Sequence, residues 1–501
     1  MATGRWPLSA ETLTSACDPR MSQMRQLRAL KVPDCPDTFR SRMDKGDTRQ
    51  LLADAARLAA GYLEALSDRP AGPLPGAAEK LVNALDQPFP ERGSDTAEIL
   101  AFLDDFGSPA TVASAGGRYF GFVTGGAMPA ALAANYLAGA WDQNSFSWVS
   151  SPAIAAFEAV ALRWVKEALG VPMAAEGALV TGAMMANFTC LAAARNRVLK
   201  QSGWDADADG LFGAPEITVI VSEEAHASLF KVLSMLGLGR DRVVKLPCDD
   251  QGRISARNLP DITGPTKTIV CLQAGNVNSG AFDPAEPLIK WAHGGGAWVH
   301  VDGAFGIWAL ASTEKAALAK GFTAADSWAT DAHKWLNVPY DSGIALVADA
   351  SALVDAMSIS GAYLMSGERR DAMNVTPESS RRARAVDIWA ALKSMGRQGL
   401  SELVERNCRQ ARTLAAALHQ AGIEVLNDVV LNQVVVSFGS DRRTNKVIAE
   451  IQDEGECWCG GTVWHGRVAM RISVSSWATT DNDIKRSLSA ILRAAQDTPS
   501  Q

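Results

Sequence analysis

Short apolar runs alternate with longer amphipathic segments through the middle of this 501-residue chain. The runs have the length of strands, and the segments between them carry apolar residues at helical spacing. This alternation predicts an α/β fold built on a central, mainly parallel sheet. The expected strands are Ala178–Thr181, Ile217–Val221, Thr268–Leu272, Ala297–Val301 and Ile344–Val347.

The two ends of the chain differ from this middle part. Helical spacing begins at Asp47 and resumes near Ile99 after proline-rich breaks, which predicts a helical N-terminal arm over residues 1–116. We expect a large domain over residues 117–388 and a small C-terminal α+β domain over residues 389–501. Beyond Arg384 we expect two long helices, Ala385–Met395 and Leu400–Gln420, and the strands Val434–Phe438 and Val468–Val474 should belong to the small domain.

Composition limits the class of protein. Hydrophobic residues make up 47% and charged residues 21% of the chain, which is typical of a globular protein with an ample core. The net charge of −7 is scattered, so we expect neither nucleic acid nor an anionic membrane as a partner. The first twenty residues lack an apolar core segment, and the eight cysteines follow no framework of spacings. Both features favour a cytoplasmic protein with reduced thiols.

Two segments suggest other readings. Tyr119 to Trp141 carries no charge and is long enough to cross a bilayer, but its glycines and proline favour a loop and a helix in the wall of a cavity. Cys457 and Cys459 lie near His465, and this set is too small for a structural metal site. We therefore predict no membrane span and no metal.

An acid and a lysine carry the chemistry. Asp302 follows the apolar run Ala297–Val301, at the strand edge where open α/β sheets bind ligands. Lys334 follows later in the chain, between His333 and Trp335. A pyridoxal phosphate site needs such a pair, since the lysine holds the aldehyde as a Schiff base and the acid keeps the ring nitrogen protonated. Taken alone, the pair also fits a buried aspartate and an unrelated surface lysine.

Four further pieces fall where such a cofactor would need them. The turn Thr181–Asn187 joins a strand to a helix, and its small residues suit a phosphate or ordinary packing. His226 follows the next strand and suits a ring face or the core. Asn276 offers a polar group at the end of another strand. Arg471 lies inside an apolar strand, so it needs an anion, either a structural carboxylate or a substrate.

In this order, the pieces resemble the group II pyridoxal-phosphate-dependent decarboxylases, which include aromatic amino acid, glutamate and diaminobutyrate decarboxylases. The resemblance runs from about Gly117 to Ile491. It rests on Arg118-Tyr119-Phe120, Phe146-Ser147-Trp148, Ser151-Pro152, Gly182–Asn187, Ala225-His226, Gly280–Pro284, His300–Ala304, Ala325-Asp326-Ser327, His333-Lys334-Trp335 and Arg471.

The resemblance implies a role for each matching residue. It implies the aspartate-aminotransferase fold (fold type I) and a homodimer with the active site near the subunit interface. The catalytic residues would be Lys334, His226 and Asp302. Around pyridoxal 5'-phosphate, Lys334 would bind the aldehyde, Asp302 the ring nitrogen, and His226 and Ala304 the two ring faces. Ala183, Met184, His333 and Asn276 would complete the cofactor site, and Arg471 would bind the α-carboxylate of the substrate.

Two departures from the family concern the chemistry. Many members carry a tyrosine for Cα protonation on a loop before an Arg-Arg pair, but residues 364–384 contain none, and Tyr363 is the nearest. Either His226 or another group protonates Cα, or the intermediate reacts with O2 and yields an aldehyde. Asp331 stands where some relatives carry asparagine near the phosphate, and a carboxylate there would repel a phosphate unless it turned away.

The residues expected to bind the substrate side chain favour two different classes of substrate. Phe146 and Phe122 favour an aromatic or bulky amino acid, whereas Asn144 matches a polar position of glutamate decarboxylases. We expect decarboxylation to an amine and CO2, with aromatic or bulky substrates slightly favoured over acidic or dibasic ones. The alternatives are an aldehyde-forming or desulfurase-like lyase on the same scaffold, or a non-catalytic binding protein that keeps the fold.

Overall fold

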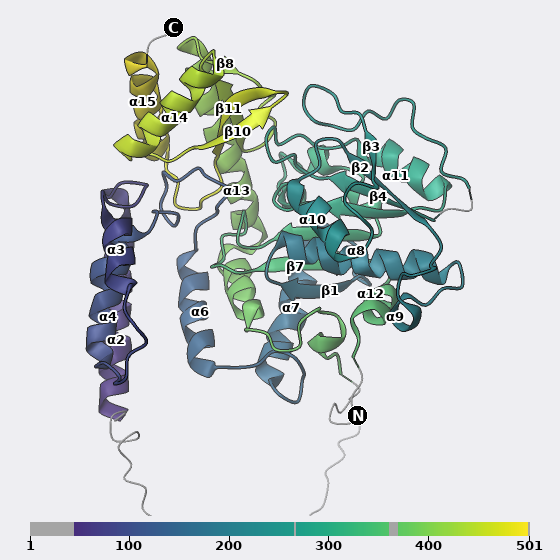
Figure 1. Ribbon diagram of the computed structural model, residues 1–501, viewed down its shortest axis with the longest axis horizontal. Helices are drawn as coiled ribbons and strands as arrows, with labels where there is room; N and C mark the ends of the chain where they lie inside the picture. Colours follow the sequence, from purple (N-terminus) through teal and green to yellow (C-terminus); the bar gives the residue numbers. More distant parts are fainter. Residues whose placement is uncertain (1–44, 265–266, 360–368, 499–501) are drawn as a thin grey trace, which may run out of the picture.

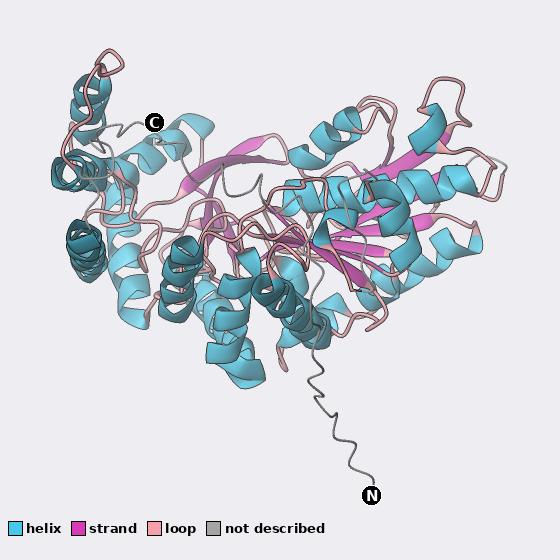
Figure 2. Ribbon diagram, turned by 90° about the horizontal axis from the view of Figure 1, so that it is seen from below, coloured by secondary structure: helices cyan, strands magenta, loops and turns pink. Residues whose placement is uncertain are grey.

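The computed structural model describes residues 45–264, 267–359 and 369–498 (Figure 1). It contains a large sheet domain, a smaller sheet beside it and a group of N-terminal helices at one side of the molecule. Figure 2 shows the strands of the large sheet between helices on both sides. This is the α/β architecture that the alternating pattern predicts.

The large sheet has seven strands in the order β1-β7-β6-β5-β4-β2-β3. β7 runs antiparallel to both of its neighbours, β1 and β6, and the other pairs are parallel. All five expected strands form, while β3 and β6 were not foreseen. The bounds are β1 Glu176–Val180, β2 Ile217–Ser222, β3 Val244–Leu246, β4 Lys267–Gln273, β5 Trp298–Asp302, β6 Ser327–Asp331 and β7 Gly343–Val347.

The strands of this sheet carry apolar side chains on both faces, so helices pack against both faces. One core cluster joins the sheet to α8 Ala183–Lys200, α10 Ala227–Met235 and α12 Ala350–Met357. The opposite cluster joins it to α6 Pro129–Trp141, α7 Pro152–Leu169, α11 Ala285–Gly294 and α13 Arg384–Gln420. Shorter helical segments are α9 Ala206–Asp209, η4 Gly306–Ala311, η5 Ala316–Ala319, η6 Phe322–Ala324 and η7 Ala372–Asn374.

A second sheet, antiparallel, lies at the C-terminal end in the order β10-β11-β9-β8. Helix α13 leads into it and is interrupted at Gly396 (φ 62°), so the two expected helices are one element with a break. The remaining bounds are β8 Glu424–Val425, β9 Gln433–Ser437, β10 Gly460–Trp464, β11 Arg467–Ser473, α14 Asp441–Glu454 and α15 Asp481–Asp497. β8 and β10 were not foreseen.

The N-terminal helices stand apart from the large sheet in Figure 1. They are α2 Lys45–Glu64, α3 Ala77–Leu85 and α4 Thr96–Phe102; the short segment η2 Ala65–Ser67 follows α2, and η3 Leu103–Gly107 and α5 Ser108–Ala110 follow α4. The turn from Ser67 to Ala71 joins these helices to the smaller sheet domain through hydrogen bonds. The guanidinium of Arg118 donates to the carbonyls of Ser67 and Arg69, and Ala71 N donates to the Gly455 carbonyl.

The uncharged segment Tyr119–Trp141 is a loop followed by helix α6. In the part of the chain that the structure describes, no helix combines the length and hydropathy that a bilayer crossing requires. Cys457 and Cys459 are buried free thiols. Across the same residues, no three His, Cys, Asp or Glu side chains gather in a way that suits a metal ion.

Candidate active site

A cavity of about 260 Å³ lies at the carboxyl edge of the large sheet. β1, β6, β5, β4 and β2 all end at this edge, because β1 and β6 are both antiparallel to β7 and the rest are parallel. Strand ends and the loops that follow them therefore converge. The cavity is lined by Gly182, Ala183, Met184, His226, Ser228, Gln273, Gly275, Val277, Asp302, Ala304, Phe305, Asp331, His333 and Lys334.

Asp302 ends β5 and is buried, with 8% of its surface exposed. Its Oδ1 accepts the backbone N–H of Ala304 at 3.1 Å, and its Oδ2 accepts Nδ2 of Asn187 at 3.2 Å. Both contacts come from neutral donors, and among the described residues no lysine, arginine or histidine forms an ion pair with this carboxylate. A buried anion with only neutral donors is suited to a cationic ligand group.

Lys334 lies in the turn after β6. Its Nζ is 2.8 Å from Oδ2 of Asp331, which ends β6. The loop before α6 packs against the backbone of this turn, and an added Cβ at Gly125 would lie 1.6 Å from the Lys334 carbonyl oxygen. Only glycine permits this approach. Trp335 is fully buried and donates from Nε1 to Oδ1 of Asn407 at 3.0 Å, which anchors the other side of the turn.

Helix α8 begins at Ala183, directly beyond the end of β1. Oδ1 of Asp331 accepts the backbone N–H of Ala183 through a short hydrogen bond. The first N–H groups of a helix lack intrahelical partners, and the helix dipole favours an anion beside them. The structure therefore has an anion-binding helix start, with the Asp331 carboxylate in contact with it.

Two histidines flank the cavity. His226 caps α10, and its Nδ1 accepts the backbone N–H of Ser228 at 3.3 Å, which leaves Nε2 to carry the proton. His226 is exposed at the open cavity, and desolvation by the surrounding protein atoms lowers its pKa. His333 accepts the Ser342 backbone N–H on Nδ1 at 3.0 Å, so its Nε2–H faces Asp331 at 3.5 Å. Burial also lowers the pKa of His333.

Arg471 comes from β11 of the smaller sheet and reaches the same region. Its Nη1 donates to the carbonyl of Val277, a cavity-lining residue, at 3.3 Å. Burial lowers its pKa, and its charge acts on His226 across the cavity. In the described chain no carboxylate lies within ion-pair distance of Arg471. A half-buried guanidinium with one carbonyl partner can still accept an anionic ligand.

Four predicted site residues lie elsewhere. Asn276 is buried in a turn, where its Oδ1 accepts the backbone N–H groups of Asn278 and Ser279. Asn144 accepts the Arg381 backbone N–H, and the Phe146 carbonyl accepts that of Met373, so both support the segment after residues 360–368. Phe122 is 64% exposed, with its ring 5.4 Å from that of Trp458. None of the four lines the cavity within this chain.

Gln273 is a cavity residue that the sequence analysis missed. It ends β4, pairs in register with Asp302, and its Nε2 is buried with no hydrogen-bond partner among the described residues. Ser228, Gly275, Val277 and Phe305 also line the cavity without having been singled out. The register of two neighbouring parallel strands was the only signal for Gln273, and it requires knowing which strands pair.

These residues fit pyridoxal phosphate. An aldehyde needs an amine, which Lys334 offers; a ring nitrogen needs an acid, which Asp302 offers; and a phosphate needs N–H donors, which the start of α8 offers. The unpartnered Nε2 of Gln273 adds a donor for the phenolic oxygen that the cofactor ring carries. The one conflict is Asp331, whose carboxylate already uses the Ala183 N–H.

Comparisons with known proteins agree with this reading. The sequence model of the pyridoxal-dependent decarboxylase conserved domain matches residues 79–438. An aromatic-L-amino-acid decarboxylase of Bacillus atrophaeus is 26% identical over 90% of this chain and 96% of its own length. A phenylacetaldehyde synthase of Arabidopsis thaliana is 23% identical over 87% of this chain and 89% of its own. The crystal structure of Oryza sativa TDC with PLP and tryptamine superposes with a TM-score of 0.83, covering 91% of this chain and 99% of that one; at 22% identity it shows the shared fold alone.

Proposed function

Because the chain belongs to the pyridoxal-dependent decarboxylase family, we propose that it converts an aromatic or other bulky L-amino acid to the amine and CO2. The enzyme is a pyridoxal-phosphate-dependent carboxy-lyase, and pyridoxal 5'-phosphate is its cofactor. The observation that supports this site assignment most strongly is one cavity lined by Lys334, Asp302 and the start of α8. When bound, the cofactor supplies a ring that accepts the electron pair released as the Cα–carboxylate bond breaks.

Each side chain has a proposed task that follows from its position. Lys334 would hold the cofactor aldehyde through Nζ, and Asp302 would keep a proton on the ring nitrogen. His226 would lie against one ring face and Ala304 against the other. His333, Ala183 and Met184 would lie at the phosphate. Arg471 would bind the substrate carboxylate, which the half-buried position of its guanidinium supports.

The charges around the cavity favour an uncharged substrate side chain. Among the described residues, the charged groups at the cavity are Asp302, Asp331 and Lys334, with Arg471 beside them. Asp302, Lys334 and Arg471 have proposed tasks toward the cofactor or the α-carboxylate, and Asp331 already pairs with Lys334. Neither an acidic nor a dibasic side chain would find a free counter-charge there. Met184, Val277 and Phe305 supply apolar surface instead.

Aldehyde formation is the second candidate. Residues 369–384 contain no tyrosine, and Tyr363 lies outside the described residues. If no acid of the protein delivers a proton to Cα, the electron pair can pass to O2 instead, and with water the products are then the aldehyde, ammonia and hydrogen peroxide. The similarity to a phenylacetaldehyde synthase supports this second candidate. His226, with its proton on Nε2, is the group we propose for protonating Cα if the amine is formed.

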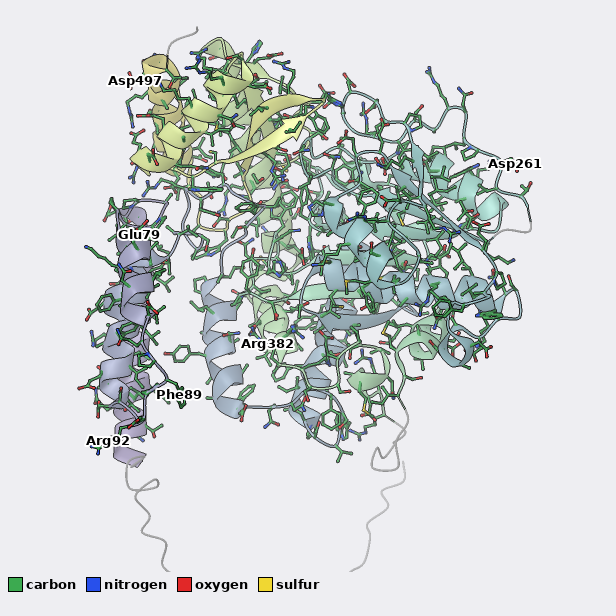
Figure 3. All side chains as sticks on the ribbon, in the orientation of Figure 1. Glu79, Phe89, Arg92, Asp261, Arg382 and Asp497 are labelled. Atoms are coloured by element: carbon green, nitrogen blue, oxygen red, sulfur yellow. The ribbon has the colours of Figure 1, made fainter. Side chains whose placement is uncertain are left out.

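We propose a homodimer, supported by apolar surface on the N-terminal helices and on the loop between α3 and α4, which contains Phe89. Phe89 is 96% exposed, and Val82, Leu85, Leu103, Leu52 and Ile99 are also largely exposed. Figure 3 draws these helices with their side chains and labels Glu79, Phe89 and Arg92. Three helices with so much exposed apolar surface are small for an independent core, so a second copy of the chain is the partner that would cover them. Sedimentation of the wild type and of Leu85→Glu would test this assembly.

A panel of L-amino acids tests the reaction. Each would be incubated with the purified, cofactor-loaded protein under air and under nitrogen, while CO2, amine, aldehyde and peroxide are measured together. CO2 and amine from aromatic substrates, in equal amounts, would support the proposal. Aldehyde and peroxide under air would support the second candidate. CO2 released only from glutamate or diaminobutyrate would contradict the proposed substrate class.

A further inference from the structure

Alternate residues of β5 face helix α8. Trp298 packs in the core cluster that contains α8, and His300 and Asp302 both reach Asn187 on that helix. Val299 and Val301 belong to the cluster on the other face of the sheet. His300 is completely buried, and so is Asn187. The proposed chemistry uses Asp302 and gives no task to either of these two.

Hydrogen bonds join these side chains in an unbroken row. Nε1 of Trp298 donates to Oγ of Ser327 at 2.9 Å, and the same Oγ lies 2.9 Å from Nδ1 of His300. Nε2 of His300 lies 2.8 Å from Oδ1 of Asn187. Nδ2 of Asn187 donates to Oδ2 of Asp302 at 3.2 Å. The row ends at the carboxylate that lines the cavity.

The chemistry of the donors sets the direction of the row. Burial lowers the pKa of His300 to about 3, so its ring is neutral and has one donor and one acceptor. An indole N–H can only donate, so the Ser327 hydroxyl accepts it and has its own hydrogen free for Nδ1 of His300. His300 then carries its proton on Nε2 and donates to the Asn187 carbonyl. The Asn187 amide is thereby turned so that its NH2 group faces Asp302.

The reverse arrangement leaves an unfavourable contact. If Nδ1 of His300 held the proton, Nε2 would accept from the Asn187 NH2 group. The Asn187 carbonyl oxygen would then face Asp302 Oδ2, with two acceptors in contact and no hydrogen between them. Two acceptors in such a buried contact have lost their hydration without gaining a hydrogen bond, which destabilises this arrangement.

We infer that His300 and Asn187 are positioning residues that orient the Asp302 carboxylate and stabilise its negative charge. This rests on the proposed function, in which Asp302 holds the proton on the cofactor ring nitrogen. An N–H donated to a carboxylate favours the anion over the acid. With Asn187 turned toward it, Asp302 leaves the proton on the ring nitrogen. With the amide flipped or removed, the carboxylate competes for that proton and the ring becomes a weaker electron acceptor.

Five variants test the row. Asn187→Leu removes the donor at nearly constant volume, and His300→Phe keeps a flat ring but removes both nitrogens. His300→Gln is the rescue variant, since its amide can donate to Asn187 and accept from Ser327. Ser327→Ala breaks the row one step farther away with the smallest change in volume. Thr189→Val is the matched control, because Thr189 is equally buried on α8 but its hydroxyl, among the described residues, bonds only to the Met185 carbonyl.

Two measurements separate positioning from simple packing. The first is the ¹⁵N resonance of ring-labelled pyridoxal phosphate bound to each variant, which reports the protonation of the ring nitrogen without any turnover. The second is kcat and KM. We expect Asn187→Leu and His300→Phe to shift the resonance toward the unprotonated ring and to lower kcat about ten- to a hundredfold with little change in KM. Ser327→Ala should show the same changes to a smaller degree, and His300→Gln and Thr189→Val should resemble the wild type.

The results distinguish this inference from the proposed function. An unshifted resonance in folded, cofactor-loaded Asn187→Leu or His300→Phe would overturn the positioning role, even if the wild type releases CO2. A wild type that releases no CO2 would overturn the proposed function, while the resonance would still decide the role of His300 and Asn187. If the two larger changes prevent folding, Ser327→Ala decides: a shifted resonance supports the inference and an unshifted one contradicts it.

Discussion

The carboxylate of Asp331 joins two groups that the cofactor needs. One oxygen lies 2.8 Å from Nζ of Lys334, and the other accepts the backbone N–H of Ala183 at the start of α8. Asp331 is almost fully buried, so these contacts are poorly screened by water. In this arrangement the protein's own anion holds the position where we propose that the cofactor phosphate binds.

Asp331→Asn should therefore tighten binding of pyridoxal phosphate about tenfold, because the amide neither repels the phosphate nor competes as an anion for Ala183 N–H. Pyridoxal, which lacks the phosphate, should bind the variant and the wild type alike. Titrations followed by cofactor absorbance would measure both. Asp349→Asn is a matched control, since Asp349 caps α12 through Ser351 N and Ala352 N away from the cavity. Weaker binding of pyridoxal phosphate by Asp331→Asn would mean that the carboxylate assists the phosphate.

Lys334 should be the residue that carries the cofactor. After borohydride reduction, peptide mapping is expected to find the pyridoxyl group on Lys334, because its Nζ lines the cavity with Asp302. Lys334→Ala should bind the cofactor without a covalent bond. Lys320→Ala serves as the control, since Lys320 is exposed and pairs with Glu286. A pyridoxyl group on Lys320 or Lys290 would refute the site assignment.

Arg471→Lys should raise KM about tenfold or more and leave the absorbance of the bound cofactor unchanged. A lysine keeps the charge but loses the planar pair of donors that matches a carboxylate. Steady-state kinetics together with absorbance spectra would test this. Arg467→Lys is the control on the same strand, because Arg467 binds Glu424 at the surface. Loss of the cofactor or of folding in Arg471→Lys would identify a structural arginine instead.

His300 should make the folded protein sensitive to acid. In the unfolded chain its imidazole gains a proton near pH 6.5, whereas burial lowers the pKa in the folded protein to about 3. The unfolded state thus binds more protons below pH 6.5, and stability falls as the pH drops through that window. Between pH 7.5 and 5 the wild type should lose about 2 kcal/mol more free energy of unfolding than His300→Gln. Urea unfolding at both pH values would measure the difference, and equal losses would show that His300 is protonated in the folded state.

Protonation of Cα gives the last prediction. If no acid replaces the missing loop tyrosine, the wild type should release aldehyde and peroxide beside the amine under air, since a positioned acid contributes about a hundred- to ten-thousandfold. Introducing tyrosine should shift the products toward the amine. Asn374 is the position for it, because Ala372 and Met373 are buried and would be overpacked. Fast amine formation without peroxide by the wild type would indicate His226 as the acid, and His226→Gln would then expose the aldehyde route.

The local pattern of the chain was enough for much of the fold. Strands such as Ile217–Ser222 and Trp298–Asp302 are apolar runs buried on both faces, and such runs are visible in one dimension. β6, Ser327–Asp331, was missed because Ser-Trp-Ala-Thr-Asp has little apolar character of its own. Its burial comes from its neighbours β5 and β7, which no local window contains.

The sequence by itself showed Asp302 at the end of an expected strand, Lys334 between His333 and Trp335, and a turn of small residues after another strand, and the family resemblance joined these three into one expected site. Only the tertiary structure decided what each of them touches. The pairing of β4 with β5 sets Gln273 beside Asp302, and the packing of β5 on α8 joins His300 to Asn187. Asp331 contacts Ala183 although 148 residues separate them. Contacts of this kind depend on strand order and packing distance, which are properties of the folded chain and leave no periodic trace in the sequence.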